Sequence, residues 1–156
     1  MQDIANQIHK LLIQKKLTIA VAESCTGGLV SSILTRCSGS SAYFLSGAVV
    51  YSNKAKHDLL KIPAKLIDFH GAVSREVAIA MTTNVRKLTR ADLGIGITGI
   101  AGPTGGTANK PVGTVYISAA NYHKTICRKY LFHGSRSAIR TRAAYAAIKI
   151  LKELIE

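Results

Sequence analysis

The sequence contains few acidic and few aromatic residues. Only 8 of its 156 residues are Asp or Glu, against 21 Lys and Arg, and Phe, Trp and Tyr together make up 6%. The resulting net charge of +13 would suit an acidic partner such as nucleic acid, a nucleotide or an anionic lipid. However, the basic residues are scattered, with no basic tail, Arg-rich block or interleaved aromatic platform. We therefore interpret the charge as a generally basic surface and expect no nucleic-acid partner.

Cysteine is also scarce. The three cysteines are odd in number and show neither CxxC nor Cys/His ligand spacing, and the five histidines follow no ligand spacing either. This pattern excludes a disulfide framework and a structural zinc site, and it is typical of a reducing compartment. We expect a cytoplasmic protein without a metal ion.

Long apolar runs are missing as well. No run approaches the roughly 18 residues that a membrane-spanning helix needs. Residues 1–13 carry polar side chains at helical spacing, which is typical of neither a signal peptide nor a membrane span. With 47% hydrophobic residues and a mean hydropathy of +0.18, the chain can nevertheless bury a core. The composition predicts a single domain over residues 1–156 that does not contact a membrane.

Helical and strand patterns alternate along the chain. Apolar spacing predicts a helix over residues 3–16, one that ends near 36, one from 53, one that Ser74 caps, and a last one over 135–155. Strands are predicted at 17–22, 44–51, 92–98, 112–120 and 124–132, and the last two are close enough for an antiparallel hairpin. This order indicates an α/β protein, a three-layer α/β/α sandwich with a mixed, mostly parallel sheet of about five strands.

Residues 18–29 contain a candidate site. A short apolar run over 19–22 stops at Glu23, Ser24 and Cys25, and two glycines follow before the next helical segment. We expect the strand to turn at once into a helix whose unpaired N–H groups would suit an anion or a developing oxyanion. Ser24 would then lie at the carboxyl edge of the sheet, where open α/β sheets bind ligands. The alternative is a Ser/Thr-capped helix start without chemistry.

A second stretch, residues 97–115, is unusually rich in glycine for one connection, which indicates a functional loop. With both stretches in view, the chain resembles the CinA C-terminal domain family, which also includes stand-alone, PncC-like nicotinamide-nucleotide amidases. Five motifs in order support the resemblance. They are AESCTGG (22–28), YSNKAK (51–56), GAVSREVA (71–78), GIAGPTGGT (99–107) and KPVGTV (110–115).

The resemblance implies an amidohydrolase that converts nicotinamide mononucleotide to nicotinate mononucleotide and ammonia, without a cofactor. Its substrate would be a small nucleotide. One alternative is a catalytically silent nucleotide-binding or DNA-damage-linked regulatory module, and another is a different small amidase or esterase that uses the same residues. Small α/β enzymes often dimerise, so a homodimer is also compatible with the sequence.

A metal-free amidase needs a nucleophile, a proton acceptor and donors for the oxyanion. Ser24 is the predicted nucleophile, and the resemblance implies a Ser–Lys dyad with Lys56, with Tyr51 nearby to orient the lysine or the substrate. Burial or a neighbouring cation would have to lower the pKa of Lys56. Cys25 is the rival nucleophile, because a thiol at a helix start gains thiolate character. The backbone N–H groups of Cys25, Thr26 and Gly27 are candidates for the oxyanion hole.

Further residues are candidates for substrate binding. Arg136 and Arg140 lie four positions apart on one predicted helix face, and resemblance to a Gly-x-Arg-x-x-x-Arg pattern makes Arg140 the preferred phosphate ligand. Gly102 and Thr107 belong to a loop that could surround an anion. Glu23 could hold the turn at Ser24 or contact a ribose hydroxyl. The other predicted pocket residues are Thr26, Gly27, Thr98, Lys110 and Thr114.

Overall fold

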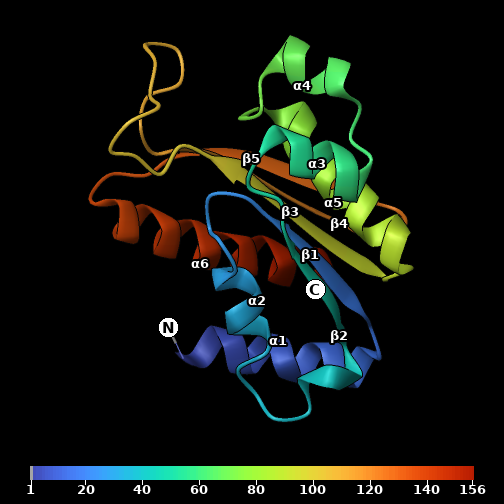
Figure 1. Ribbon diagram of the computed structural model, residues 1–156. Coiled ribbons are helices and arrows are strands. Elements are labelled where there is room, and N and C mark those ends of the chain that lie inside the picture. The colour runs from blue at the N-terminus through green and yellow to red at the C-terminus, as the bar shows by residue number, and fades with distance from the viewer. Residues whose placement is uncertain (1) are drawn as a thin grey trace.

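The structure is a computed structural model that describes residues 2–156, with side chains from residue 4 onward. It contains a five-stranded sheet with strand order β2-β1-β3-β4-β5 (Figure 1). The strands are β1 (Ile19–Glu23), β2 (Phe44–Val49), β3 (Leu93–Gly99), β4 (Thr114–Ala120) and β5 (Thr125–Leu131). The helices are α1 (Gln2–Lys15), α2 (Leu29–Leu34), η1 (Ser40–Ala42), α3 (Asn53–Leu60), α4 (Ala64–His70), α5 (Arg75–Thr89) and α6 (Arg136–Ile155). Within residues 2–156, no helix is long and apolar enough to cross a membrane.

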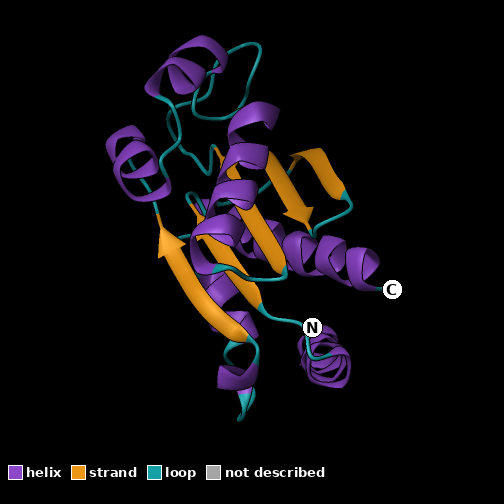
Figure 2. Ribbon diagram, turned by 90° about the vertical axis from the view of Figure 1, so that its right-hand side faces the viewer, coloured by secondary structure: helices purple, strands orange, loops and turns teal. Residues whose placement is uncertain are grey.

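The sheet is mixed and mostly parallel. Strand β1 pairs in parallel with both β2 and β3, whereas β4 is antiparallel to β3 and to β5. Strand β5 therefore runs in the same direction as β3, and β4 is the only reversed strand of this sheet. Helices α1, α2 and α6 cover one face, and α3, α4 and α5 cover the other (Figures 1 and 2). The predicted three-layer sandwich and its closing hairpin are confirmed.

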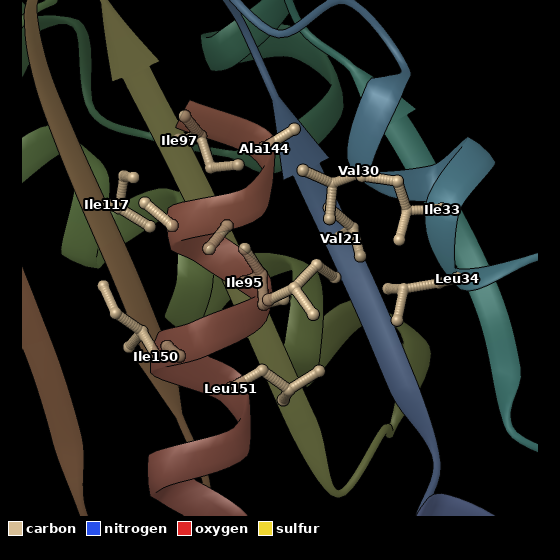
Figure 3. Packing of buried hydrophobic residues seen from close by; sticks show 14 of the residues in the cluster. Val21, Val30, Ile33, Leu34, Ile95, Ile97, Ile117, Ala144, Ile150 and Leu151 are labelled. Carbon is tan, nitrogen blue, oxygen red and sulfur yellow. The ribbon is translucent and has the colours of Figure 1, made fainter. Parts of the chain in front are cut away.

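Branched aliphatic side chains of the sheet and of α2 and α6 form most of the core beneath α6, together with alanines of α6 such as Ala144 (Figure 3). Val21 of β1, Ile95 of β3 and Ile117 of β4 are fully buried on this face. Val30 of α2 and Leu151 of α6 pack against them from the helical layer. Because successive strand residues point to opposite faces, this alternation accounts for the burial of every residue of β1 between two helical layers.

The opposite face of the sheet is built from very small residues. A Cβ atom placed on Gly96 would lie 2.5 Å from the carbonyl oxygen of Ala78, and one on Gly94 would lie 2.5 Å from that of Thr82. The backbone of α5 therefore packs directly against β3. Ala20 of β1 belongs to the same layer.

The carboxyl ends of four strands meet at one edge of the sheet. Beyond β1 the chain continues at Ser24, whose N–H donates to the carbonyl oxygen of Ile97 in β3 at 3.0 Å. Helix α3 begins directly after β2, and α6 begins shortly after β5. The glycine-rich connection 100–113 leaves β3 at the same edge (Figure 1). Residues from these four connections are thereby brought together.

Candidate active site

The turn after β1 separates Ser24 from the following helix. Helix α2 begins only at Leu29, because Gly27 (φ 58°) and Gly28 (φ 96°) both adopt left-handed conformations. The expectation that the strand turns at once into a helix is therefore wrong. Gly27 is also a point of close approach, since a Cβ atom there would lie 2.9 Å from Nη2 of Arg140. Only glycine combines this conformation with this contact.

The carboxylate of Glu23 occupies the N-terminus of α2. It is fully buried and accepts hydrogen bonds from the backbone N–H groups of Gly28, Val30 and Ser31 at 2.8–3.1 Å, and from the Ser31 hydroxyl at 2.7 Å. The first N–H groups of α2 are consequently satisfied within the protein, so they do not offer the predicted anion site. Of the two roles considered for Glu23, these contacts correspond to holding the turn, not to binding ribose.

Lys56 lies beside Ser24. Its Nζ atom is 3.2 Å from Ser24 Oγ and donates to the carbonyl oxygens of Val50 and Tyr51 at 3.0 Å each. The lysine side chain is 1% exposed and Ser24 is 7% exposed. Sequence positions 24 and 56 meet because β1 and β2 are parallel neighbours, so that their carboxyl ends lie at the same edge.

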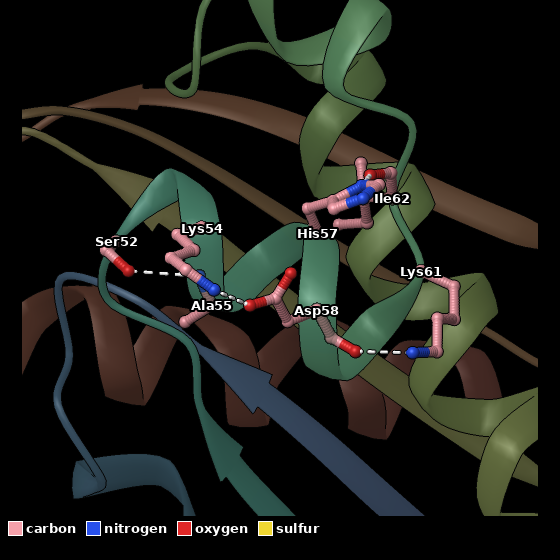
Figure 4. Close-up of polar contacts among 7 residues, drawn as sticks. All are labelled: Ser52, Lys54, Ala55, His57, Asp58, Lys61 and Ile62. Carbon is pink, nitrogen blue, oxygen red and sulfur yellow. Dashed lines mark hydrogen bonds and ion pairs between the residues drawn. The ribbon is translucent and has the colours of Figure 1, made fainter.

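Helix α3 is anchored at both ends, which fixes the direction of Lys56. The Ser52 hydroxyl accepts a hydrogen bond from the Ala55 N–H at 3.0 Å and thereby caps the N-terminus (Figure 4). At the other end, His57 Nδ1 lies 2.8 Å from the carbonyl oxygen of Ile62. Lys56 faces the sheet between these two anchors.

Two titratable groups, Lys56 and Cys25, lie next to Ser24. Burial shifts the pKa of each in the direction that favours its neutral form. It lowers the pKa of Lys56, because an ammonium group loses its hydration in the interior, and the neighbouring Cys25 opposes this shift only in part. Burial raises the pKa of the Cys25 thiol to about 12. A neutral amine is suited to accept a proton, whereas a protonated thiol is a poor nucleophile.

Two backbone N–H groups of the turn are free for an oxyanion. Within the described part of the chain, the Thr26 N–H makes no hydrogen bond, and the Cys25 N–H makes none beyond a contact with its own thiol. The Gly27 N–H donates to the carbonyl oxygen of Ser24 at 3.1 Å and is therefore engaged. Of the three predicted oxyanion donors, Cys25 and Thr26 have the required freedom and Gly27 does not.

Arg140 holds the turn instead of facing open solvent. Its Nε donates to the carbonyl oxygen of Cys25 at 3.1 Å, and its Nη2 donates to that of Thr26 at 2.9 Å. The predicted role of phosphate ligand does not correspond to these contacts, because the guanidinium group already binds the backbone that carries Ser24. Arg140 is a clamp between α6 and the turn.

Arg136, one helical turn earlier, is the arginine that reaches the rim of the site. It is exposed and donates from Nη1 to the carbonyl oxygen of Gly102 and from Nη2 to the hydroxyl of Tyr51, both at 2.7 Å. Tyr51 thus links Arg136, through its hydroxyl, with Lys56, through its carbonyl. Arg136 is the first arginine of the Gly-x-Arg-x-x-x-Arg pattern, but resemblance to that pattern favoured Arg140 as the phosphate ligand.

The remaining predicted residues flank this edge. The Thr98 hydroxyl donates to the carbonyl oxygen of Ala72 at 2.7 Å, and Lys110 Nζ donates to that of His70 at 3.0 Å. Both contacts tie the sheet edge to the segment that precedes α5. Thr107 is exposed and accepts a hydrogen bond from the Lys110 N–H at 3.1 Å, which closes the loop on itself.

Four predicted residues with hydroxyl groups are buried, namely Ser24, Thr26, Thr98 and Thr114, and two of these hydroxyls lack a hydrogen-bond partner in the described chain. The hydroxyls of Thr26 and Thr114 are buried and find no hydrogen-bond partner among the residues that the structure describes. Such groups are uncommon in native proteins, and Arg86 Nε and Ser118 Oγ, which are not predicted site residues, are likewise buried without a partner among the described residues. Within the same residues, no group of three or more His, Cys, Asp or Glu side chains is arranged to hold a metal ion.

A cavity of about 590 Å³ lies elsewhere and does not contain this chemistry. It opens between α1, β5 and α6, and its lining consists of Ile4, Tyr130, Phe132, Thr141, Arg142, Tyr145, Ala146 and Lys149. No nucleophile paired with a base is among them. The edge that carries Ser24 and Lys56 is therefore the better candidate for an active site.

Comparison with known proteins identifies the relatives of this chain. The family model described as the CinA C-terminal domain matches residues 1–155. A putative competence-damage inducible protein of Desulforudis audaxviator is 46% identical over 148 residues, which are 95% of this chain and 36% of that protein. A CinA-like protein of Geotalea uraniireducens is 47% identical over 152 residues, again 36% of its length. The chain thus spans about a third of the length of these relatives.

Solved structures of similar proteins have the same fold. The competence/damage inducible protein CihA from Agrobacterium tumefaciens superimposes with a TM-score of 0.97 at 34% identity, covering 99% of this chain and 95% of that one. A competence or damage-inducible protein from Enterobacter asburiae gives 0.95 at 28% identity, covering 99% and 98%.

Proposed function

Because the chain belongs to the CinA C-terminal domain family, we propose that it is an amidohydrolase that converts nicotinamide mononucleotide to nicotinate mononucleotide and ammonia. The name of the Desulforudis relative refers to competence and damage induction, that of the Geotalea relative only to CinA, and the chain covers only about a third of the length of each. The proposal therefore relies on the chemistry of the site together with the motifs that resemble nicotinamide-nucleotide amidases.

The observation that carries the proposal is the environment of Lys56 Nζ. A neutral amine has two N–H donors and one lone pair. The carbonyl oxygens of Val50 and Tyr51 accept from the two donors, and the third direction is that of Ser24 Oγ at 3.2 Å. The lone pair then faces the hydroxyl whose proton must be removed. Because Lys56 is buried and its pKa is lowered, the neutral form is accessible.

The proposed reaction has two halves. Ser24 Oγ attacks the carboxamide carbon while its proton passes to Lys56 Nζ, and the oxyanion of the tetrahedral intermediate accepts hydrogen bonds from the N–H groups of Cys25 and Thr26. Lys56 returns the proton to the departing nitrogen, and ammonia leaves. Water then attacks the acyl carbon while one of its protons passes to Lys56 Nζ. The bond between the acyl carbon and Ser24 Oγ breaks, Lys56 returns that proton to Ser24 Oγ, and the released carboxylic acid loses its own proton to solvent.

The substrate fits the charge of the protein. Its pyridinium ring makes the carboxamide more electrophilic, and its phosphate is anionic, as suits a chain with a net charge of +13.

We expect the reaction to take place in the cytoplasm, since all three cysteines are free thiols. No step of the proposed reaction calls for a cofactor.

The test is an assay of ammonia and nicotinate mononucleotide formation from nicotinamide mononucleotide. The unchanged protein should turn over, Ser24→Ala should lose at least about a thousandfold in kcat, and Cys25→Ala should keep most of the activity. Nicotinamide riboside and simple aliphatic amides complete the panel. Turnover of simple amides but not of the nucleotide would indicate a different amidase. Binding of the nucleotide without any turnover would indicate a silent nucleotide-binding module, and either result would overturn the proposal.

A further inference from the structure

Two arginines at the start of α6 have no acidic partner. Among residues 4–156, whose side chains are described, the ion pairs involve neither Arg136 nor Arg140. Glu23, a carboxylate that belongs to the same edge, is fully occupied at the N-terminus of α2. The edge of the site consequently carries two positive charges, and the hydrogen-bond partners of the two guanidinium groups are neutral oxygen atoms.

The two arginines differ in how readily they could exchange those neutral partners for an anion. Arg140 is half-buried and holds two backbone carbonyl oxygens of the turn, so its release would loosen the turn that carries Ser24. Arg136 is exposed, and its partners are the hydroxyl of Tyr51, a residue 55% exposed, and the carbonyl oxygen of Gly102 in the glycine-rich loop. Its guanidinium can turn to an anion without disturbing Ser24.

We propose that Arg136 and the Tyr51 hydroxyl form the subsite that binds the phosphate monoester of the substrate, an inference that rests on the proposed amidase function. A guanidinium group matches a phosphate in bidentate geometry, and a charge-assisted bond to phosphate is stronger than one to a neutral hydroxyl or carbonyl. Once Arg136 turns to the phosphate, the Tyr51 hydroxyl is free to donate to a second phosphate oxygen.

Tyr51 also sets the place of this subsite relative to the chemistry. Its carbonyl oxygen accepts from Lys56 Nζ, whereas its hydroxyl contacts Arg136. The subsite therefore lies about one tyrosine side chain away from the catalytic amine. A nucleotide has the same layout, because its ribose separates the reacting ring from the phosphate. Phosphate bound by Arg136 would thus orient the carboxamide toward Ser24. Arg136 and the Tyr51 hydroxyl together determine specificity for the phosphorylated substrate.

The test compares Arg136→Gln with Arg142→Gln, a matched control on the same helix whose arginine donates to the carbonyl oxygen of His133 away from the site. With nicotinamide mononucleotide, Arg136→Gln should raise KM about ten- to a hundredfold and leave kcat within about threefold, since one or two charge-assisted bonds are lost. With nicotinamide riboside, its kinetics should equal those of the unchanged protein. Tyr51→Phe should show the same pattern with a smaller effect, and Arg142→Gln should show none.

A binding measurement separates failure of this inference from failure of the proposed function. Ribose 5-phosphate is titrated calorimetrically into Ser24→Ala protein with and without Arg136→Gln, after thermal unfolding shows that both variants are folded. Loss of binding on Arg136→Gln supports the subsite even if the unchanged protein releases no ammonia. Equal binding by both variants, or equal kinetic losses of Arg136→Gln on nucleotide and riboside, would overturn the subsite while the amidase reaction stands.

Discussion

Arg140 donates from Nη2 to the carbonyl oxygen of Thr26 at 2.9 Å, which joins the last helix to the turn after the first strand across 114 sequence positions. The same guanidinium holds the carbonyl oxygen of Cys25. The peptide unit of the Cys25 carbonyl also carries the Thr26 N–H, one of the two groups proposed to bind the oxyanion, whereas the Thr26 carbonyl belongs to the following unit, that of the Gly27 N–H. Arg140 therefore fixes the direction of the Thr26 N–H from the carbonyl side of its peptide unit and holds the next unit of the turn as well.

The first prediction concerns this clamp. Arg140→Ala should lower kcat on nicotinamide mononucleotide and on the riboside by a similar factor, about ten- to a hundredfold, because hydrogen bonds from a charged group contribute roughly 1.5–3 kcal/mol each and misplaced oxyanion donors act on the transition state. Steady-state kinetics on both substrates measures the effect, with Arg142→Ala as control. A rise in KM confined to the nucleotide would instead make Arg140 the phosphate ligand.

The second prediction concerns Glu23. Glu23→Gln should lower the free energy of unfolding by about 2–4 kcal/mol, because an amide nitrogen would then face N–H donors that the carboxylate now satisfies. Denaturant titration measures the loss. Glu153→Gln is the matched control, since Glu153 pairs with Arg128 at the surface and should cost less than about 1 kcal/mol. Equal losses of unfolding free energy for the two variants would show that the buried contacts of Glu23 stabilise the fold no more than a surface ion pair does.

The third prediction concerns the rival nucleophile. Burial raises the pKa of Cys25 to about 12, so its thiol should stay protonated and unreactive at neutral pH. With iodoacetamide near pH 8, followed by peptide mass spectrometry, Cys37 and Cys127 should be alkylated before Cys25, because both are partly exposed whereas Cys25 is 3% exposed. Rapid alkylation of Cys25, accompanied by loss of activity, would reopen its role as nucleophile.

Much of the architecture could be predicted from the sequence, because it depends on short-range patterns. The apolar run before Ser24 and the cap signal before Lys56 mark the ends of two strands, and parallel neighbours bring such ends together. Their pairing as a dyad, however, was implied by the resemblance and not by spacing, since composition alone could not show that burial would lower the pKa of Lys56.

Other features could not be predicted because they depend on which backbone a long side chain meets. The sequence leaves open whether Glu23 holds the turn at Ser24 or contacts a ribose hydroxyl, and the left-handed conformations of Gly27 and Gly28, which bring the start of α2 back onto its carboxylate, favour the first role. Arg136 and Arg140 share a helix face, and sequence spacing alone does not distinguish them. Only the path of the chain between β5 and α6 decides that one meets the turn and the other meets Tyr51.

The last prediction concerns the protonation of Lys56. Its pKa is lowered in the folded protein, whereas the unfolded chain keeps the proton up to the ordinary lysine pKa of about 10.4. Between these two values unfolding takes up a proton, so the free energy of unfolding should rise with pH in that window. Turnover should rise with pH over the lower part of the same range, because the neutral amine is the base.

Lys56→Met removes both effects, since methionine neither titrates nor accepts a proton. Denaturant titrations at several pH values between about 7 and 10 should therefore show the unchanged protein gaining stability relative to Lys56→Met as the pH increases. Lys65→Met, which replaces an exposed lysine, should instead follow the unchanged protein at every pH. Lys56→Arg should be inactive, because guanidinium keeps its proton at any usable pH. Parallel stability curves for the unchanged protein and Lys56→Met, or an active Lys56→Arg enzyme, would show that position 56 supplies positive charge and not a base.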